Sequence, residues 1–144
     1  LEEAIDELKP EVVIALGICN EPCYRIERVA HNLDDTEVPD NRAEVRRSLR
    51  IIEDGPDRYE APYSHVELAR RLEEKGLPWR FSDSAGGFLC NHVFYHLCRL
   101  AVSPRRAVHA ATFLHVPPLA EGDELGGLIE AIGCAVEAAL DSVS

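Results

Sequence analysis

The chain contains no methionine and only two lysines, Lys9 and Lys75, although it is 144 residues long. Acidic residues outnumber basic ones by 26 to 15, which gives a formal net charge of −11. An interface for nucleic acid or for an anionic membrane needs the opposite balance, and single strands also need aromatic rings among the basic side chains. The short basic run over residues 42–50 has no aromatic residue. We therefore expect neither nucleic acid nor a membrane as a partner.

The chain also lacks the even-numbered set of cysteines that a secreted disulfide framework needs, because it has five. This pattern predicts free thiols and a reducing compartment, the cytoplasm. Cys19 and Cys23 have no second pair of cysteines or histidines at zinc-finger spacing, so we expect no metal. No apolar run approaches the roughly 18 residues of a membrane-spanning helix.

The first residues already follow a helical pattern, with apolar side chains at Leu1, Ala4, Ile5 and Leu8. No initiating methionine precedes this pattern. The length suits one domain, and 46% hydrophobic residues are enough for a core. We therefore expect residues 1–144 to form a single domain that lacks its N-terminal portion.

Apolar runs and turn signals predict an alternation of strands and helices. Strands are expected over residues 12–17, 25–33, 79–82 and 109–116, and helices over 1–8, 64–75, about 90–101 and 125–140. Residues 34–62 are rich in turn formers and form a long excursion, which is typical of a functional or mobile loop. The alternation predicts an α/β layered fold with a mainly parallel sheet, whose ligands bind beyond the carboxyl ends of the strands.

Cys90 lies where a short strand, a glycine turn and a helix follow one another. The small residues at 84–87 allow a substrate or another backbone to come close. The first turn of a helix carries unpaired N–H groups and partial positive charge, which favour a thiolate. The alternative is a buried cysteine that only fills space.

A thiol nucleophile needs a base, and the chain offers six histidines: His31, His65, His92, His96, His109 and His115. His92 and His96 are on the Cys90 helix but face elsewhere or lie more than a turn away. His109 opens the last strand and His115 closes it, roughly 20 Å apart at about 3.3 Å per residue. Only the closing end shares an edge of the sheet with Cys90, so we prefer His115. A satisfied core histidine is the alternative.

A third group would orient the imidazole of the base. Glu27 lies among β-branched residues and is a better candidate than Asp34 or Asp35 in the acidic loop. The alternative is an exposed pair of Glu27 with Arg28, worth well under about 1 kcal/mol. The spacing leaves this choice open.

Three segments coincide with one family. Ile26–Asn32, Ser84–Asn91 and Phe113–Pro117 resemble, in this order, the glutamate, cysteine and histidine motifs of pyroglutamyl peptidase type I, also called pyrrolidone-carboxylate peptidase. The gap lengths agree as well as the residue types. The resemblance is clear from Val12 to Pro118 and looser over the last helix.

The resemblance implies a three-layer α/β/α fold, phosphorylase/hydrolase-like, with the N-terminal strand region missing. It also implies a cysteine omega-peptidase that removes an N-terminal pyroglutamate (5-oxoproline) residue from peptides through a thioester. By this carry-over Cys90 is the nucleophile, His115 is the base, and Glu27 fixes the tautomer of His115. No metal or organic cofactor is implied, and a homo-oligomer is favoured.

The resemblance places Phe88 and Leu89 at pocket-lining positions beside the nucleophile. Ile18 stands where many bacterial members have glutamine, and Glu37 where many have arginine. The family's aromatic Gly-Phe-x-Pro-Phe-Gly-Gly loop is absent, so we expect residues 1–144 alone to hydrolyse pyroglutamyl substrates poorly or not at all. The alternatives are a catalytically silent truncated homologue or assembly fragment, and a cysteine hydrolase of altered specificity.

Overall fold

A computed structural model of the chain describes residues 1–104, 107–119 and 125–143. Within these ranges helices and strands alternate largely as the apolar pattern predicts. In chain order the elements are α1 (Glu2–Leu8), β1 (Val12–Ile18), β2 (Tyr24–Glu27), β3 (Val29–His31), β4 (Arg58–Glu60), α2 (His65–Glu74), β5 (Trp79–Ser82), α3 (Leu89–Ala101), β6 (Ala110–Val116) and α4 (Gly126–Val143).

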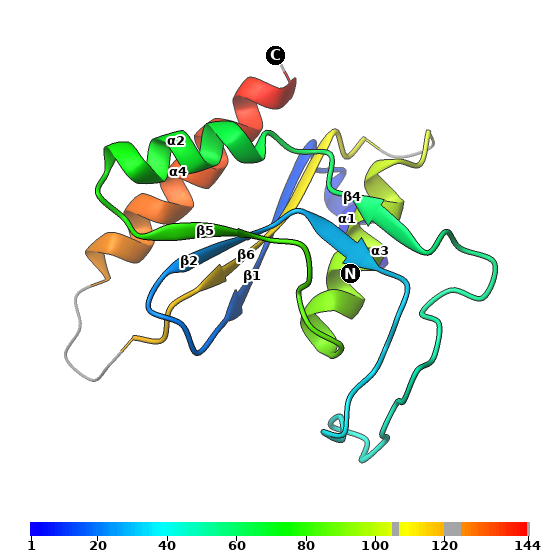
Figure 1. Cartoon of the computed structure of the whole chain (residues 1–144). Helices are drawn as coiled ribbons and strands as arrows, with labels where there is room; N and C mark the ends of the chain where they lie inside the picture. The colour runs from blue at the N-terminus through cyan, green and yellow to red at the C-terminus, as the bar shows by residue number, and fades with distance from the viewer. Residues whose placement is uncertain (105–106, 120–124, 144) are drawn as a thin grey trace.

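The main sheet has the strand order β1-β6-β2-β5. β1 runs parallel to β6, β2 runs parallel to β5, and the two pairs meet in an antiparallel contact between β2 and β6. The sheet is therefore mostly parallel, as predicted. Figure 1 shows α2 and α4 together on one side of this sheet and α3 on the other, which gives three layers.

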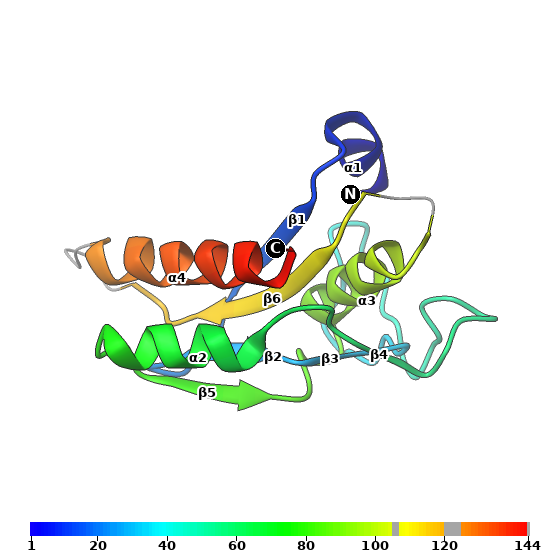
Figure 2. The same cartoon turned by 90° about the horizontal axis from the view of Figure 1, so that it is seen from above.

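Strand β6 is buried along its whole length and separates two hydrophobic cores. Leu114 and Val116 pack with α2 and α4, whereas Phe113 packs with Phe94 of α3. Because successive side chains of a strand point to opposite faces, His115 belongs to the α3 face together with Phe113. The view from above in Figure 2 shows β6 running between α4 and α3.

The prediction of one strand over residues 25–33 is wrong, because the chain changes sheets in the middle of that segment. β2 ends at Glu27 in the main sheet, and β3 pairs antiparallel with β4 in a separate two-stranded sheet. Arg28 is the crossing point: its N–H donates to the carbonyl of Ser82, and its own carbonyl accepts from Ala61. Pairing with distant segments makes this break, and the local sequence does not signal it.

The long excursion over residues 34–62 contains β4, which the sequence pattern did not predict. Polar side chains hold the rest of this segment. Asn32 donates to the carbonyl of Ile52 at 2.8 Å and accepts from two backbone N–H groups of the loop, and the hydroxyl of Tyr95 donates to the carbonyl of Pro56 at 2.7 Å. These bonds tie the loop to β3 and α3.

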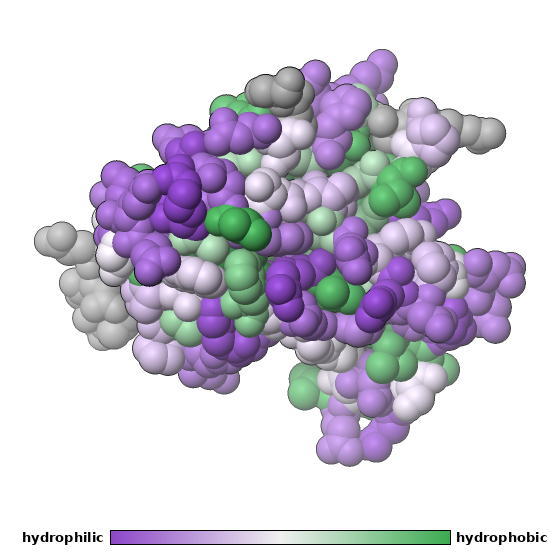
Figure 3. All heavy atoms as spheres, turned by 45° about the horizontal axis from the view of Figure 1, so that its top comes forward, coloured by the Kyte–Doolittle hydropathy of each residue, from purple (hydrophilic) through white to green (hydrophobic). Residues whose placement is uncertain are grey.

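Helix α2 presents an apolar face to the core and a charged face to solvent. Leu68 and Leu72 are fully buried, while Arg71 pairs with Glu137 and Asp141 of α4. Figure 3 shows the molecule from this side, where hydrophilic residues predominate and hydrophobic ones are scattered. Each exposed ion pair contributes little to stability, so burial of the leucines is the main interaction that holds α2 against the core.

His65, the first residue of α2, should make the fold sensitive to acid. Burial lowers the pKa of His65 from 6.5 to about 4, and its Nε2 is buried without a hydrogen-bond partner. Below pH 6.5 His65 becomes protonated in the unfolded chain, whereas in the folded chain it stays neutral down to about pH 4. The contribution of His65 to the free energy of unfolding is therefore present above pH 6.5 and falls by on the order of 3 kcal/mol as the pH drops to about 4.

Urea unfolding of the wild type and of His65→Gln at pH 7 and 4.5 tests this expectation. We expect a smaller loss of stability at the lower pH in His65→Gln. His109→Gln, which removes an exposed imidazole, is the control and should behave like the wild type. An acid-induced loss of equal size in all three proteins would contradict the prediction.

Candidate active site

A glycine turn places Cys90 in the first turn of α3. Gly86 has a φ of 89°, a backbone conformation that suits glycine. The backbone of Asp35 crosses directly over Gly87: the Asp35 N–H donates to the Gly87 carbonyl at 2.8 Å, and a Cβ on Gly87 would lie 2.2 Å from the Asp35 carbonyl oxygen. The start of α3 is therefore pinned against the loop.

Asn91 fixes α3 to β3 from the position next to Cys90. Its side-chain oxygen accepts from the N–H of His31 at 2.9 Å, and its amide donates to the carbonyls of His31 and Leu33. All three bonds belong to a fully buried side chain. The helix that carries Cys90 therefore has a fixed rotation about its axis.

The thiol of Cys90 is half-buried, whereas Cys19, Cys98 and Cys134 are buried. The Cys90 thiol lies near the imidazole of His115 and raises its pKa. The first N–H groups of a helix have no partner within the helix and can stabilise negative charge on a nearby sulfur or oxygen. Burial raises the pKa of the Cys98 thiol to about 12, as is typical of an inert structural cysteine.

His115 lies on the α3 face of β6 and contacts Glu27 of the neighbouring strand. Its Nδ1 is 2.8 Å from Oε1 of Glu27, and Glu27 has no exposed surface. An ionised carboxylate only accepts hydrogen bonds, so Nδ1 carries the proton of this contact. The neutral imidazole then has Nε2 free to accept a proton.

The partners of His115 change its protonation. Burial by itself lowers the pKa of His115, but hydrogen bonds with Cys90 and Glu27 outweigh burial and raise the pKa to about 9. The imidazole is therefore charged near neutral pH. A cation beside a sulfur favours the thiolate, which is the nucleophilic form of cysteine.

The structure also places the other side chains that the sequence left open. Arg28 pairs with Asp83 at 2.7 Å and not with Glu27, so the alternative of an exposed Glu27–Arg28 pair is wrong. Of the two other candidates for the orienting group, Asp34 pairs with His92 at 2.9 Å, and Asp35 accepts from the backbone N–H of Ser48 at 3.1 Å. His92 thus has its own partner and is not the base of Cys90.

Sequence reasoning missed Arg25 at this site. Its Nε and Nη2 donate to Oε1 of Glu27 at 2.9 and 2.7 Å, and its Nη2 lies 3.4 Å from Nδ1 of His115. Arg25 is two residues before Glu27 in β2 and shares its face, while Tyr24 and Ile26 pack in the opposite core. The two-residue period of the strand was the available signal.

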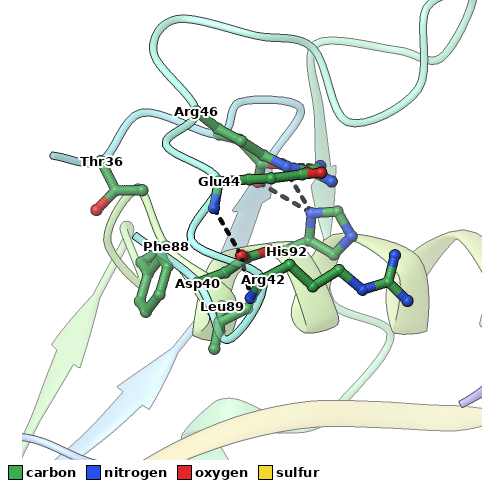
Figure 4. Close-up of a pocket in the computed structure, with 10 residues that line it drawn as sticks. Thr36, Asp40, Arg42, Glu44, Arg46, Phe88, Leu89 and His92 are labelled. Atoms are coloured by element: carbon green, nitrogen blue, oxygen red, sulfur yellow. Dashed lines mark hydrogen bonds and ion pairs between the residues drawn. The ribbon is translucent and has the colours of Figure 1, made fainter. Parts of the chain in front are cut away.

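Phe88 and Leu89 line a pocket of about 240 Å³ beside the start of α3. Figure 4 shows this pocket, in which His92 of α3 faces Arg42 and Arg46 of the loop. Charged side chains of the loop form much of the remaining lining, and Cys90 is not among the lining residues. The remaining lining residues are Asp34, Thr36, Asp40, Glu44 and Gly87.

Ile18 and Glu37, the two departures from the family pattern, lie outside that pocket lining. Ile18 ends β1 with 73% of its surface exposed, one residue beyond Gly17, which faces His115 across the strand pair. Glu37 is on the loop and pairs with Arg47 at 3.0 Å. The structure therefore brings Glu27, Cys90 and His115 together and places Phe88 and Leu89 in one pocket, with Ile18 apart from them.

In the described ranges we find no group of three or more histidine, cysteine, aspartate or glutamate side chains suited to a metal ion. Cys19 instead directs its thiol to backbone carbonyls, including that of Val116 at 3.5 Å. No helix among the described residues is long and apolar enough to cross a membrane.

Comparison with known proteins gives concordant matches. A family model described as pyroglutamyl peptidase matches residues 1–137. Pyrrolidone-carboxylate peptidase of Bacillus cytotoxicus is 39% identical over 123 residues, and that of Bacillus cereus is 36% identical over 122 residues. Each match covers 84% of this chain but 56% of the relative, so the chain spans little more than half the length of these curated relatives.

Solved structures match as well. Pyroglutamyl peptidase I from Bacillus amyloliquefaciens superimposes with a TM-score of 0.89 at 26% identity, over 99% of this chain and 71% of that one. A mutant pyrrolidone carboxyl peptidase from Pyrococcus furiosus gives 0.92 at 27% identity, over 99% and 75%. The layered fold described above is therefore the fold of these proteins.

Gly87→Ala should loosen the start of α3, because the new Cβ would collide with the Asp35 carbonyl. We expect a loss of about 1–3 kcal/mol in the free energy of unfolding, together with slower alkylation of Cys90 by iodoacetamide. Gly133→Ala in α4 is the matched control, since a Cβ there meets no atom within 4 Å and should stabilise by up to about 1 kcal/mol. Unchanged stability and alkylation in Gly87→Ala would show that the loop does not hold the turn.

Proposed function

The chain belongs to the pyroglutamyl peptidase family, and from this premise we propose that it is a cysteine peptidase that removes N-terminal pyroglutamate from peptides. The observation that carries the proposal is that the Cys90 thiol lies near the imidazole of His115, whose Nδ1 is held by a buried carboxylate. A nucleophile, a base and an orienting group in this order are the parts of a covalent hydrolase.

In the proposed reaction the Cys90 sulfur attacks the carbonyl carbon that follows the lactam ring, which forms a C–S bond and a tetrahedral oxyanion. Backbone N–H groups at the start of α3 stabilise this oxyanion, an interaction worth roughly 3 kcal/mol per donor in comparable sites. His115 then gives its proton to the leaving amine as the C–N bond breaks. The product of this half-reaction is a thioester on Cys90.

In the second half-reaction a water molecule attacks the thioester, and His115 accepts its proton. Collapse of the tetrahedral intermediate breaks the C–S bond and releases pyroglutamic acid. The proton returns to the Cys90–His115 pair. Glu27 keeps Nδ1 protonated throughout, so that Nε2 exchanges the proton.

Phe88, Leu89 and Ile18 are the proposed substrate contacts. Phe88 and Leu89 directly precede Cys90 in the chain and line a pocket at the start of α3, and this proximity to the sulfur supports their assignment. A lactam is uncharged, whereas an open-chain N-terminal glutamate brings an ammonium and a carboxylate. Burying those charges without partners is costly, so the site should reject them.

Hydrolysis of a pyroglutamyl amide tests the proposed function. We expect the chain to cleave it, however slowly, and to prefer it to the glutamyl and prolyl amides by at least about 100-fold, because unpaired polar groups are strongly rejected. Pretreatment with iodoacetamide should remove the activity. A chain that alkylates rapidly at Cys90 but hydrolyses none of the amides would instead be a catalytically silent member of the family. A preference for prolyl amide would indicate altered specificity.

Individual cysteine variants separate the nucleophile from the structural thiols. Cys90→Ala should abolish hydrolysis, whereas Cys134→Ala and Cys98→Ala should retain most of the rate per folded molecule, since buried thiols are inert. Far-UV circular dichroism of each variant controls for folding. Loss of activity on alkylation of Cys98, with Cys90 still free by peptide mass spectrometry, would refute the assignment.

A further inference from the structure

We propose that Arg25 is a positioning residue of this site and that Glu21 and Arg80 hold it from the outside. Strand registry places the three basic residues on one line across the sheet: Arg25 is the partner of His115 in β6 and of Arg80 in β5. The proposal deepens the proposed function, because it concerns the same histidine, but its test does not need a substrate.

At the buried end of this row of charged residues, three hydrogen bonds converge on one oxygen atom. Oε1 of Glu27 accepts from Nδ1 of His115 and from Nε and Nη2 of Arg25, whereas Oε2 of Glu27 is buried without a hydrogen-bond partner among the described residues. A carboxylate with no exposed surface needs a nearby cation. Arg25 supplies that cation and a second, rigid constraint on the direction of Oε1.

The outer part continues the alternation of charge toward solvent. Nη1 of Arg25 is 3.1 Å from Oε1 of Glu21, and Arg80 binds both oxygens of Glu21 at 2.7 Å. The exposed fraction of the side chains falls from 45% at Arg80 through 36% at Glu21 and 17% at Arg25 to 0% at Glu27.

Glu21 explains how two arginines can face each other across β2 and β5. Like charges directly opposite each other in a sheet are destabilising. Here Glu21 bonds to both Arg25 and Arg80 and offsets their repulsion. The arginine pair and the loop carboxylate therefore form one unit, and its inner end is the group that orients His115.

The effect of Arg25 on His115 depends on Glu27. Nη2 of Arg25 lies 3.4 Å from Nδ1 of His115, and arginine can only donate hydrogen bonds. With Glu27 in place, Nδ1 of His115 carries a proton, and the guanidinium of Arg25 donates its hydrogen bonds to the carboxylate. Without that carboxylate, Arg25 is positioned to donate to Nδ1, which favours the tautomer with its proton on Nε2. That tautomer cannot take a proton from Cys90.

A double-mutant cycle on Arg25 and Glu27 tests the proposal, with the rate of Cys90 alkylation by iodoacetamide from pH 5 to 10 as the measurement. Arg25→Met should lower the rate at pH 7 by about tenfold, the middle of the range for directly coupled side chains. It should also change the half-maximal pH of alkylation, because the imidazole beside Cys90 is no longer held in one orientation. In the Glu27→Gln background the same substitution should leave the rate unchanged or raise it.

Three further variants complete the experiment. Arg25→Lys, which keeps the charge without the planar fork, should fall between the wild type and Arg25→Met. Glu21→Gln loosens Arg25 from the exposed side and should give a smaller change in the same direction, so it replaces Arg25→Met if that variant does not fold. Arg28→Met, which removes an adjacent cation paired with Asp83, should leave the pH profile unchanged.

The outcomes separate the proposal from its alternatives. Equal losses for Arg25→Met in both backgrounds would show that Arg25 acts on stability alone and would overturn the proposal. An unaltered pH profile in both Arg25→Met and Glu21→Gln would do the same. If the wild type fails to hydrolyse pyroglutamyl amide while the alkylation cycle behaves as expected, the proposed function fails and the role of Arg25 stands.

Discussion

The candidate site depends on one atom, Oε1 of Glu27. It lies 2.8 Å from Nδ1 of His115 and 2.7 Å from Nη2 of Arg25, inside a carboxyl group that has no exposed surface. Neither side chain would hold its orientation without this acceptor, and burial of the carboxyl group would be costly without these partners. The imidazole, the carboxylate and the guanidinium therefore fix one another, and the proposed role of Cys90 depends on where its thiol lies relative to these three groups.

The alternation of side chains along β2 and β6 makes this meeting possible. Leu114 and Ile26 pack into the core under α2 and α4, so His115 and Glu27 point to the α3 face. A slip of one residue in either strand would put the polar groups into that core and the leucine or isoleucine at the site. The same apolar burial that stabilises the sheet therefore sets the register of the site.

The sequence predicts the parts of this arrangement that are local. The fully buried run of β6, the glycine turn before Cys90 and the helix that follows all carry strong signals, and His115 is distinguished by its place at the carboxyl end of a strand. It does not predict the break at Arg28 or strand β4, because both arise from pairing between distant segments. The two-residue period of the strand places Arg25 on the same face as Glu27, but its position opposite His115 depends on pairing with another strand.

Packing, and not the polar groups alone, sets the distance between Cys90 and His115, the proposed nucleophile and base. Cys90 belongs to α3, which is joined to β3 by Asn91 and to the loop by Tyr95, whereas His115 belongs to the sheet. The two parts meet where Phe94 of α3 packs on Phe113 of β6, with ring centroids 5.8 Å apart, and Phe113 in turn lies 4.9 Å from the ring of His115. A change in the volume of either phenylalanine should therefore change the separation of thiol and imidazole, so that side chains outside the proposed triad influence the proposed proton transfer.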